Sequence, residues 1–106
     1  MRPPLQIMNR AFAVLESLPQ GVAFEIFAKL DLLTEFPEIG SPLGLRFPDL
    51  KGFRQLIFKR RIRIIYDFDQ SDRIIYVLAI IDCKRKMPRG RDLKRDLSPG
   101  DELPLE

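Results

Sequence analysis

The feature that most constrains the fold is a pair of β-strand patterns joined by a short acidic turn. Residues 61–68 alternate apolar side chains with arginine and aspartate, the period of a strand with one buried face. Residues 69–72, DQSD, supply side chains that bond their own backbone in tight turns. Residues 73–81, RIIYVLAII, are apolar on both faces, as in a strand covered on both sides. We therefore expect an antiparallel hairpin, with a third strand over residues 53–58 beside it.

Two helices are expected before these strands. A proline pair at Pro3 and Pro4 suits a helix start, and apolar residues then recur at helical spacing as far as Leu18. Residues 19–21, PQG, end that helix, and a second amphipathic helix is predicted over residues 22–35. The short connection predicts an antiparallel helix hairpin. Its apolar stripe needs a partner, which the sheet supplies.

Length and composition indicate one domain without a metal. The 106 residues are enough for a single core, expected over residues 1–97, and residues 98–106, SPGDELPLE, read as a flexible acidic tail. One cysteine and no histidine exclude a disulfide framework and a zinc site, so we expect no cofactor. No apolar run approaches the ~20 residues that span a bilayer, and the N-terminus lacks an export signal. A cytoplasmic protein without a membrane partner is predicted.

Positive charge is concentrated in the second half of the chain. Residues 51–96 carry fourteen basic and six acidic side chains. Arg61 and Arg63 share one face of their strand, no acidic residue occurs between Leu50 and Tyr66, and a basic cluster at residues 84–86 ends the next strand. Such a face is either an ordinary polar face that contacts only solvent or an anion-binding surface. The unpaired cations favour a surface for a polyanion or an acidic protein.

The sequence contains no complete catalytic motif. Without histidine, Ser/His/Asp and Cys/His arrangements are excluded, and the glycines are too far apart for a phosphate-cradling loop. Asp67, Asp69 and Asp72 are interpreted as shaping the hairpin turn rather than binding a metal. The remaining candidates for chemistry are arginines, which can bind phosphates and stabilise the negative charge that develops when a phosphodiester is attacked. A plain binding surface uses the same residues.

The order of these motifs resembles the RelE/ParE superfamily of toxins from type II toxin–antitoxin systems. The resemblance covers about residues 8–88 and rests on the connection FPEIGSP, then GFRQLIF, an arginine (Arg63) three residues before a strand tyrosine (Tyr66), and a YVLAI strand ending in a basic cluster. It implies an α+β fold with an N-terminal antiparallel helix hairpin packed on a twisted antiparallel sheet, here of three to four strands. It also implies an antitoxin that wraps and neutralises the toxin.

Site residues and targets follow from the resemblance as expectations. The catalytic candidates are Arg54, Arg63 and Arg85, with Lys84 as the alternative to Arg85, and no metal is implied. Contacts to nucleic acid are expected from Lys51, Lys59, Arg60, Arg61, Lys84 and Lys86. The implied partners are a cognate antitoxin and either the ribosome with mRNA or DNA gyrase, with operator DNA contacted only through the antitoxin.

Two departures from the superfamily keep three functions open. Residues 84–106 lack the tyrosine or histidine that serves as acid or base in RelE-like nucleases, and the two prolines argue against a first strand within residues 1–7. The chain is therefore expected to be a ribosome-dependent mRNA endonuclease, a non-catalytic gyrase inhibitor, or a non-toxic interaction module. Each reading requires the arginine-bearing side of the sheet to be open.

Overall fold

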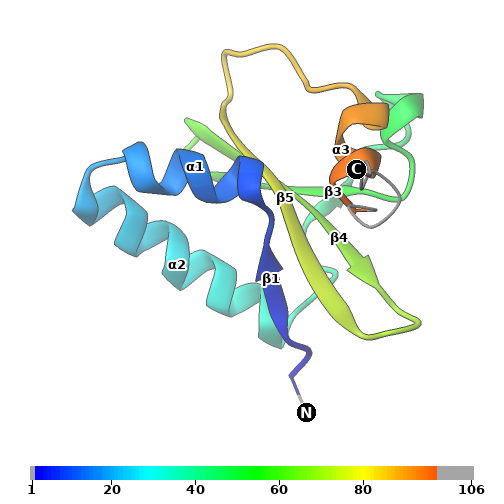
Figure 1. Ribbon diagram of the computed structural model, residues 1–106, viewed down its shortest axis with the longest axis horizontal. Helices are drawn as coiled ribbons and strands as arrows, with labels where there is room; N and C mark the ends of the chain where they lie inside the picture. The colour runs from blue at the N-terminus through cyan, green and yellow to red at the C-terminus, as the bar shows by residue number, and fades with distance from the viewer. Residues whose placement is uncertain (1, 98–106) are drawn as a thin grey trace, which may run out of the picture.

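The protein is a five-stranded sheet between two helical layers, as the computed structural model describes for residues 2–97 (Figure 1). The strands are β1 (Leu5–Ile7), β2 (Ser41–Pro42), β3 (Arg54–Phe58), β4 (Ile62–Asp69) and β5 (Ile74–Asp82). The helices are α1 (Asn9–Ser17), α2 (Gln20–Glu35) and α3 (Gly90–Leu97), with a 3-10 turn η1 (Pro48–Leu50). The predicted tail, residues 98–106, lies outside the described part of the chain. The expected α+β fold is confirmed.

The β4–β5 hairpin is the centre of the sheet, as predicted. The strand order is β1-β5-β4-β3-β2, with antiparallel pairs except for the parallel β1–β5 pair. The turn is shaped by Asp69, whose carboxylate accepts the backbone N–H groups of Ser71 at 2.9 Å and Asp72 at 3.1 Å. This arrangement is the side-chain-to-backbone turn that Asp favours.

Helices α1 and α2 cover one side of the sheet, which we call the inner face (Figure 1). Helix α1 begins at Asn9 rather than near the proline pair, and α2 begins at Gln20, two residues earlier than predicted. The core between helices and sheet is built from buried residues of both layers: Ala11, Leu15, Ile26, Leu30, Leu33, Phe58, Ile64, Tyr66, Ile75, Val77 and Ile80. The predicted helix hairpin is thus confirmed, together with the inward face of β4.

Residues 1–7 do contain a strand, although the proline pair argued against one. Residues Leu5–Ile7 form an edge strand parallel to β5, paired from Leu5 with Ile75 to Ile7 with Val77. The prolines do not interfere because they precede the strand, and Pro4 contributes only its carbonyl oxygen, which accepts the N–H of Ile75 at 3.0 Å. The sheet consequently has five strands rather than three to four.

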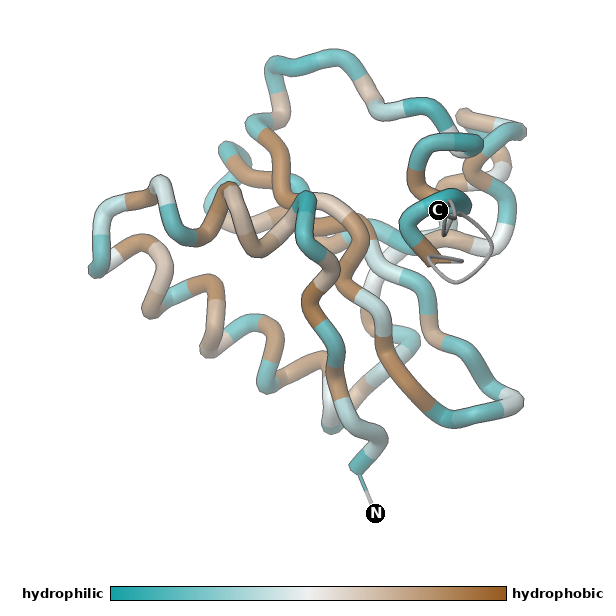
Figure 2. The backbone as a smooth tube through the Cα atoms, viewed as in Figure 1, coloured by the Kyte–Doolittle hydropathy of each residue, from teal (hydrophilic) through white to brown (hydrophobic). Residues whose placement is uncertain are grey.

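The expectation of an open outer face was also wrong for part of the sheet. A second apolar cluster covers that side and includes Met8, Leu43, Leu50, Phe53, Ile65, Leu78, Ala79 and Leu93. A β-bulge contributes to this cluster, because Ile65 pairs with Ala79 while Tyr66 pairs with Val77. The bulge directs two consecutive apolar residues of β5 to the outer side. Figure 2 shows the resulting apolar strands between polar turns.

Helix α3 closes this second cluster, and short contacts hold it in place. The side chain of Leu93 is fully buried, and the N–H of Gly90 donates to the Asp49 carboxylate at 2.7 Å. A Cβ at Gly90 would overlap the backbone of Asp49, so the helix start needs glycine. Arg10 and Asp96 form a salt bridge at 2.9 Å. Helix α3 therefore forms a layer on the outer side of the sheet (Figure 1).

None of the helices within residues 2–97 is long and apolar enough to cross a membrane.

Candidate functional site

Two groups of cations from separate segments meet at one end of the sheet. Antiparallel pairing places Ile62 beside Asp82, and the N–H of Cys83 donates to the carbonyl oxygen of Arg61 at 2.7 Å. The turn before β4 therefore lies next to the segment after β5. We call the six cations of these two segments the basic pole: Lys59, Arg60, Arg61, Lys84, Arg85 and Lys86. All six side chains are exposed.

The β3–β4 turn at the basic pole has a strained backbone. It is closed by the N–H of Arg61 donating to the carbonyl oxygen of Phe58 at 3.0 Å. Both central residues, Lys59 and Arg60, have positive φ angles, 51° and 58°. A type I′ turn requires this conformation and ordinarily uses Asn-Gly, because a side chain with a Cβ is disfavoured there. Lys59 and Arg60 thus occupy positions that Asn and Gly would suit better, and Arg73 at the other end of β4 and β5 has the same conformation, with a φ of 55°.

The cations of the basic pole are largely free of partners inside the protein. Lys59 pairs with Glu25 of α2 at 3.1 Å, but both side chains are at least half exposed. Such a surface pair contributes little to stability. In residues 2–97, the other five cations make no salt bridge. Their mutual repulsion would be relieved by a bound polyanion.

Arg63 lies one step from the basic pole, on the outer face of β4, and it is only half exposed. Its Nη1 donates to the side-chain oxygen of Gln55 on β3. Its Nε is buried and has no hydrogen-bond acceptor among the described residues. A buried, unsatisfied donor is unfavourable. The expectation that Arg63 stands open on the surface was therefore wrong, although its Nε–H remains without an acceptor among the described residues.

Arg54 lies on the inner face, opposite to Arg63. It pairs across the strands with Tyr66, and cross-strand partners project to the same side. Its Nη1 donates to the carbonyl oxygens of Gly40 at 2.7 Å and Glu38 at 3.2 Å. Arg54 thus holds the connection after α2 in place by hydrogen bonds. It does not lie near Arg63, because the two side chains are on opposite faces of the sheet.

The phenol of Tyr66 fastens the same connection. Its hydroxyl donates to the carbonyl oxygen of Pro37 at 2.8 Å and accepts the N–H of Gly40 at 2.9 Å. Burial raises the pKa of the Tyr66 hydroxyl, although the Gly40 N–H bond lowers it in part. The group therefore stays protonated and able to donate at neutral pH. Tyr66 is fully buried in the inner cluster, and its hydrogen bonds give it a structural role.

Sequence reasoning missed a cleft at the basic pole. It has a volume of about 410 Å³ and lies between the last turn of α1 and the strand ends. Its lining consists of Val14, Ser17, Leu18, Arg61, Ile62, Ile80, Ile81, Asp82 and Arg85. No local sequence pattern predicts this cleft, because it forms only where the end of α1 packs beside the strand ends. Lys51 lies elsewhere, exposed after η1 and beside Gly44.

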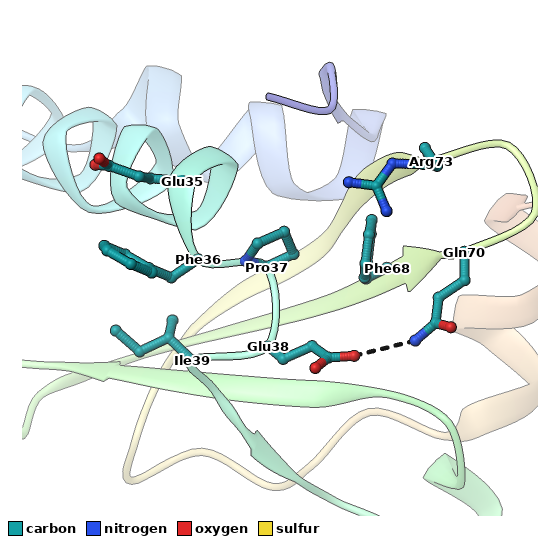
Figure 3. Close-up of a pocket in the computed structure, with 8 residues that line it drawn as sticks. All are labelled: Glu35, Phe36, Pro37, Glu38, Ile39, Phe68, Gln70 and Arg73. Atoms are coloured by element: carbon teal, nitrogen blue, oxygen red, sulfur yellow. Dashed lines mark hydrogen bonds between the residues drawn. The ribbon is translucent and has the colours of Figure 1, made fainter. Parts of the chain in front are cut away.

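A second concavity, the hairpin-end groove, lies at the other end of β4 and β5 (Figure 3). It has a volume of about 730 Å³ and is lined by Glu35, Phe36, Pro37, Glu38, Ile39, Phe68, Gln70 and Arg73. Gln70 donates to the Glu38 carboxylate at 3.0 Å, and the Arg73 guanidinium lies 5.4 Å from the centre of the Phe68 ring. Arg73, the one cation among the residues that line the groove, therefore already lies over an aromatic ring.

A comparison with protein families gives one match that covers most of the chain. The family described as "ParE toxin of type II toxin-antitoxin system, parDE" matches residues 9–87. A comparison with curated protein sequences gives no match.

Several solved toxin structures share the fold. The toxin–antitoxin complex RelBE2 from Mycobacterium tuberculosis matches with a TM-score of 0.68 and 18% identity, over 77% of this chain and 99% of that one. The isolated E. coli RelE toxin matches with a TM-score of 0.65 and 18% identity, over 88% and 97%. The archaeal RelE–RelB complex from Pyrococcus horikoshii gives 0.54 and 19%, over 81% and 100%. At these identities the likeness establishes the fold.

Proposed function

The chain belongs to the ParE toxin family of type II toxin–antitoxin systems, and we propose that it arrests growth by binding a nucleic-acid-processing machine through the basic pole, without cleaving RNA itself. DNA gyrase is the expected target, in keeping with the ParE-like alternative. A cognate antitoxin is the expected inhibitor, because solved relatives of this fold are complexes of a toxin with its antitoxin. A cytoplasmic location, and contact with operator DNA only through the antitoxin, belong to the same proposal.

The observation that carries this proposal is the separation of the arginines expected to catalyse cleavage. Arg54 is on the inner face and holds the carbonyl oxygens of Glu38 and Gly40. Arg63 is on the outer face and is bonded to Gln55. Stabilising a phosphodiester transition state requires charged donors aimed at one point. The exposed pole, by contrast, needs only proximity to bind a polyanion.

Ribosome-dependent mRNA cleavage is the second candidate function, and one observation favours it. The unsatisfied Nε of Arg63 lies on the strand that begins at the basic pole, where Arg85 is exposed. Release of the Gln55 contact would let Arg63 turn toward a phosphate held at the pole. The likeness to RelE toxins is compatible with this reading, but at these identities it concerns the fold alone.

Expression of the chain without an antitoxin separates the candidates. Cellular mRNA ends and plasmid supercoiling should be mapped in the same culture after induction. We expect growth arrest with altered supercoiling and no new cuts within codons. Abundant cleavage within codons would overturn the binding proposal in favour of the nuclease. Normal growth at a high level of folded protein would support a non-toxic interaction module.

The matched control for this experiment is Arg73→Gln. Arg73 is exposed like the cations of the basic pole, but it lies at the hairpin-end groove. Its replacement changes net charge by the same amount as Arg85→Gln. We expect Arg85→Gln to weaken growth arrest and Arg73→Gln to leave it intact. Equal effects of the two variants would show that total charge matters rather than the basic pole.

A further inference from the structure

The cleft at the basic pole has the features of a site for one nucleotide, and we propose that it binds a single unstacked nucleotide of a nucleic-acid strand. The base would lie between the apolar walls, and the phosphate would meet Arg61 and Arg85 at the mouth. This inference deepens the proposed function, on which it rests, by naming the chemical group that the basic pole takes up.

The walls of the cleft are apolar and come from two layers. Val14 of α1 and Leu18, the residue after α1, pack in the inner-face cluster with Ile62 and Ile80, and Ile81 also lines the cleft. The volume of about 410 Å³ lies within the ~300–1,000 Å³ typical of small-ligand sites. These walls contain no aromatic ring, so a base would be held by aliphatic contact and guanidinium stacking. Such contacts discriminate poorly between bases.

The two arginines of the cleft are available for a phosphate. Neither Arg61 nor Arg85 has a salt bridge within the described residues, even though Asp82 lines the same cleft. Guanidinium groups bind phosphate bidentately, with stronger bonds than those between neutral partners. They come from different segments, fixed side by side by the bond between Cys83 N–H and the Arg61 carbonyl oxygen.

Asp82 distinguishes a nucleotide from an acidic peptide side chain. Its Oδ1 accepts the N–H of Lys84 at 2.8 Å, which orients the carboxylate, and its Oδ2 makes no hydrogen bond within residues 2–97. The cleft therefore offers two cationic groups and one acceptor. A nucleotide supplies both complements, an anionic phosphate and donor groups on its base or sugar. A carboxylate side chain supplies the anion but no donor for the Asp82 carboxylate.

The remaining cations of the basic pole extend the site along a strand. Lys59, Arg60, Lys84 and Lys86 are exposed around the segments that bear the two arginines. Phosphates flanking the bound nucleotide would meet these side chains. Binding of a single strand should therefore be strongly salt-dependent, while occupation of the cleft by one nucleotide should depend less on salt.

The test is an NMR titration of the full chain, with labelled isoleucine methyl groups, by uridine 5′-monophosphate. We expect shifts at isoleucines 62, 80 and 81, and none at Ile39 or Ile74 at the opposite end of the sheet. Arg85→Gln should weaken the affinity about tenfold, because it removes a charged bond to phosphate. The matched variant Lys86→Gln, which changes the same charge outside the cleft lining, should weaken it much less.

A second variant fills the cleft without changing charge. Val14→Trp lies on the half-buried side of α1 and should abolish the isoleucine shifts while the protein stays folded. Unchanged shifts in Val14→Trp, or equal losses in Arg85→Gln and Lys86→Gln, would overturn the proposal. Displacement of the mononucleotide by a glutamate-rich peptide at lower concentration would overturn it in favour of an acidic peptide site. Growth arrest by the unmodified chain, without these shifts, would leave the basic pole functional and reject only the nucleotide cleft.

Discussion

The two ends of the β4–β5 pair differ in both charge and internal bonding. One end is the basic pole, where five of the six cations have no salt bridge in the described part of the chain. The other end is the hairpin-end groove, with carboxylates at Glu35 and Glu38 and exposed apolar side chains at Phe36 and Ile39. Strands of this length separate the two ends by about 25 Å. The unpaired cations favour binding of a polyanion at the basic pole, and the carboxylates of the groove disfavour it there.

Residues that hold the fold together lie near the groove, and residues that are free to bind lie at the pole. Near the groove, Arg54 and the hydroxyl of Tyr66 form hydrogen bonds with backbone groups of the chain itself. At the pole, the backbone of Lys59 and Arg60 is strained and their side chains are exposed. Substitutions near the groove should consequently affect stability, and substitutions at the pole should affect binding.

The largest effect is expected from Gly40→Ala. A Cβ at Gly40 would lie 2.6 Å from the Gln55 carbonyl oxygen and 2.7 Å from the Tyr66 hydroxyl, so the connection must move away from the sheet. We expect a loss of about 3 kcal/mol in the free energy of unfolding, measured by urea denaturation. Gly21→Ala is the control, because nothing lies within 4 Å of its added Cβ. In the first turn of α2 that change should be neutral or stabilising, and an equal loss in both variants would contradict the account.

The next effect is expected from Tyr66→Phe. The change keeps the buried ring but leaves the N–H of Gly40 and the carbonyl oxygen of Pro37 without this partner. The free energy of unfolding should fall by about 2 kcal/mol. Growth arrest at equal levels of folded protein should be unchanged, since the hydroxyl lies far from the pole. A loss of growth arrest in a stable Tyr66→Phe variant would show that the hydroxyl belongs to the surface that binds the target.

Replacing the strained turn should have opposite effects on stability and binding. The double change Lys59→Asn with Arg60→Gly suits positive φ angles and should stabilise the hairpin by about 1–2 kcal/mol. It also removes two cations, so the logarithmic salt dependence of single-strand binding should weaken by about 2. Thermal denaturation and fluorescence anisotropy measure the two changes. Greater stability with undiminished binding would mean that the turn does not contact the nucleic acid.

The smallest effect is expected from Asp67→Asn. Burial, followed by the charge of Asp69, raises the pKa of the half-buried Asp67 carboxyl, so ionisation is less favourable in the folded state. This cost is present at neutral pH, above the raised pKa, and disappears as the pH falls below the ordinary value of ~4. Asp67→Asn should therefore raise stability at pH 7 by less than about 1 kcal/mol, because solvent screens the group. The gain should vanish near pH 3, and a gain that persists there would have another cause.

The sequence predicts the local elements well because their patterns are local. Alternation in residues 61–68 and the DQSD turn determined the hairpin, and the β4–β5 pairing agrees. The first strand was missed because Leu5–Ile7 is stabilised by parallel pairing with β5, a long-range contact without a pattern of its own. The outer cluster was missed because a bulge turns both Leu78 and Ala79 outward, which strict alternation cannot anticipate.

The candidate site was predictable in part. The cations of residues 59–61 and 84–86 are apparent in the sequence, and their meeting follows from the antiparallel hairpin. The engagement of Arg63 by Gln55 and of Arg54 by backbone oxygens depends on tertiary geometry. The cleft depends on where α1 ends relative to the sheet.

The central claim is that the basic pole, rather than the opposite end, carries the toxic activity. The most direct measurement is growth arrest by two charge-neutralised variants at equal levels of folded protein. One variant combines Arg61→Gln with Arg85→Gln, and the other combines Glu35→Gln with Glu38→Gln. The account predicts that the pole variant permits growth and that the groove variant still arrests it. Arrest by the pole variant, with growth restored by the groove variant, would contradict it.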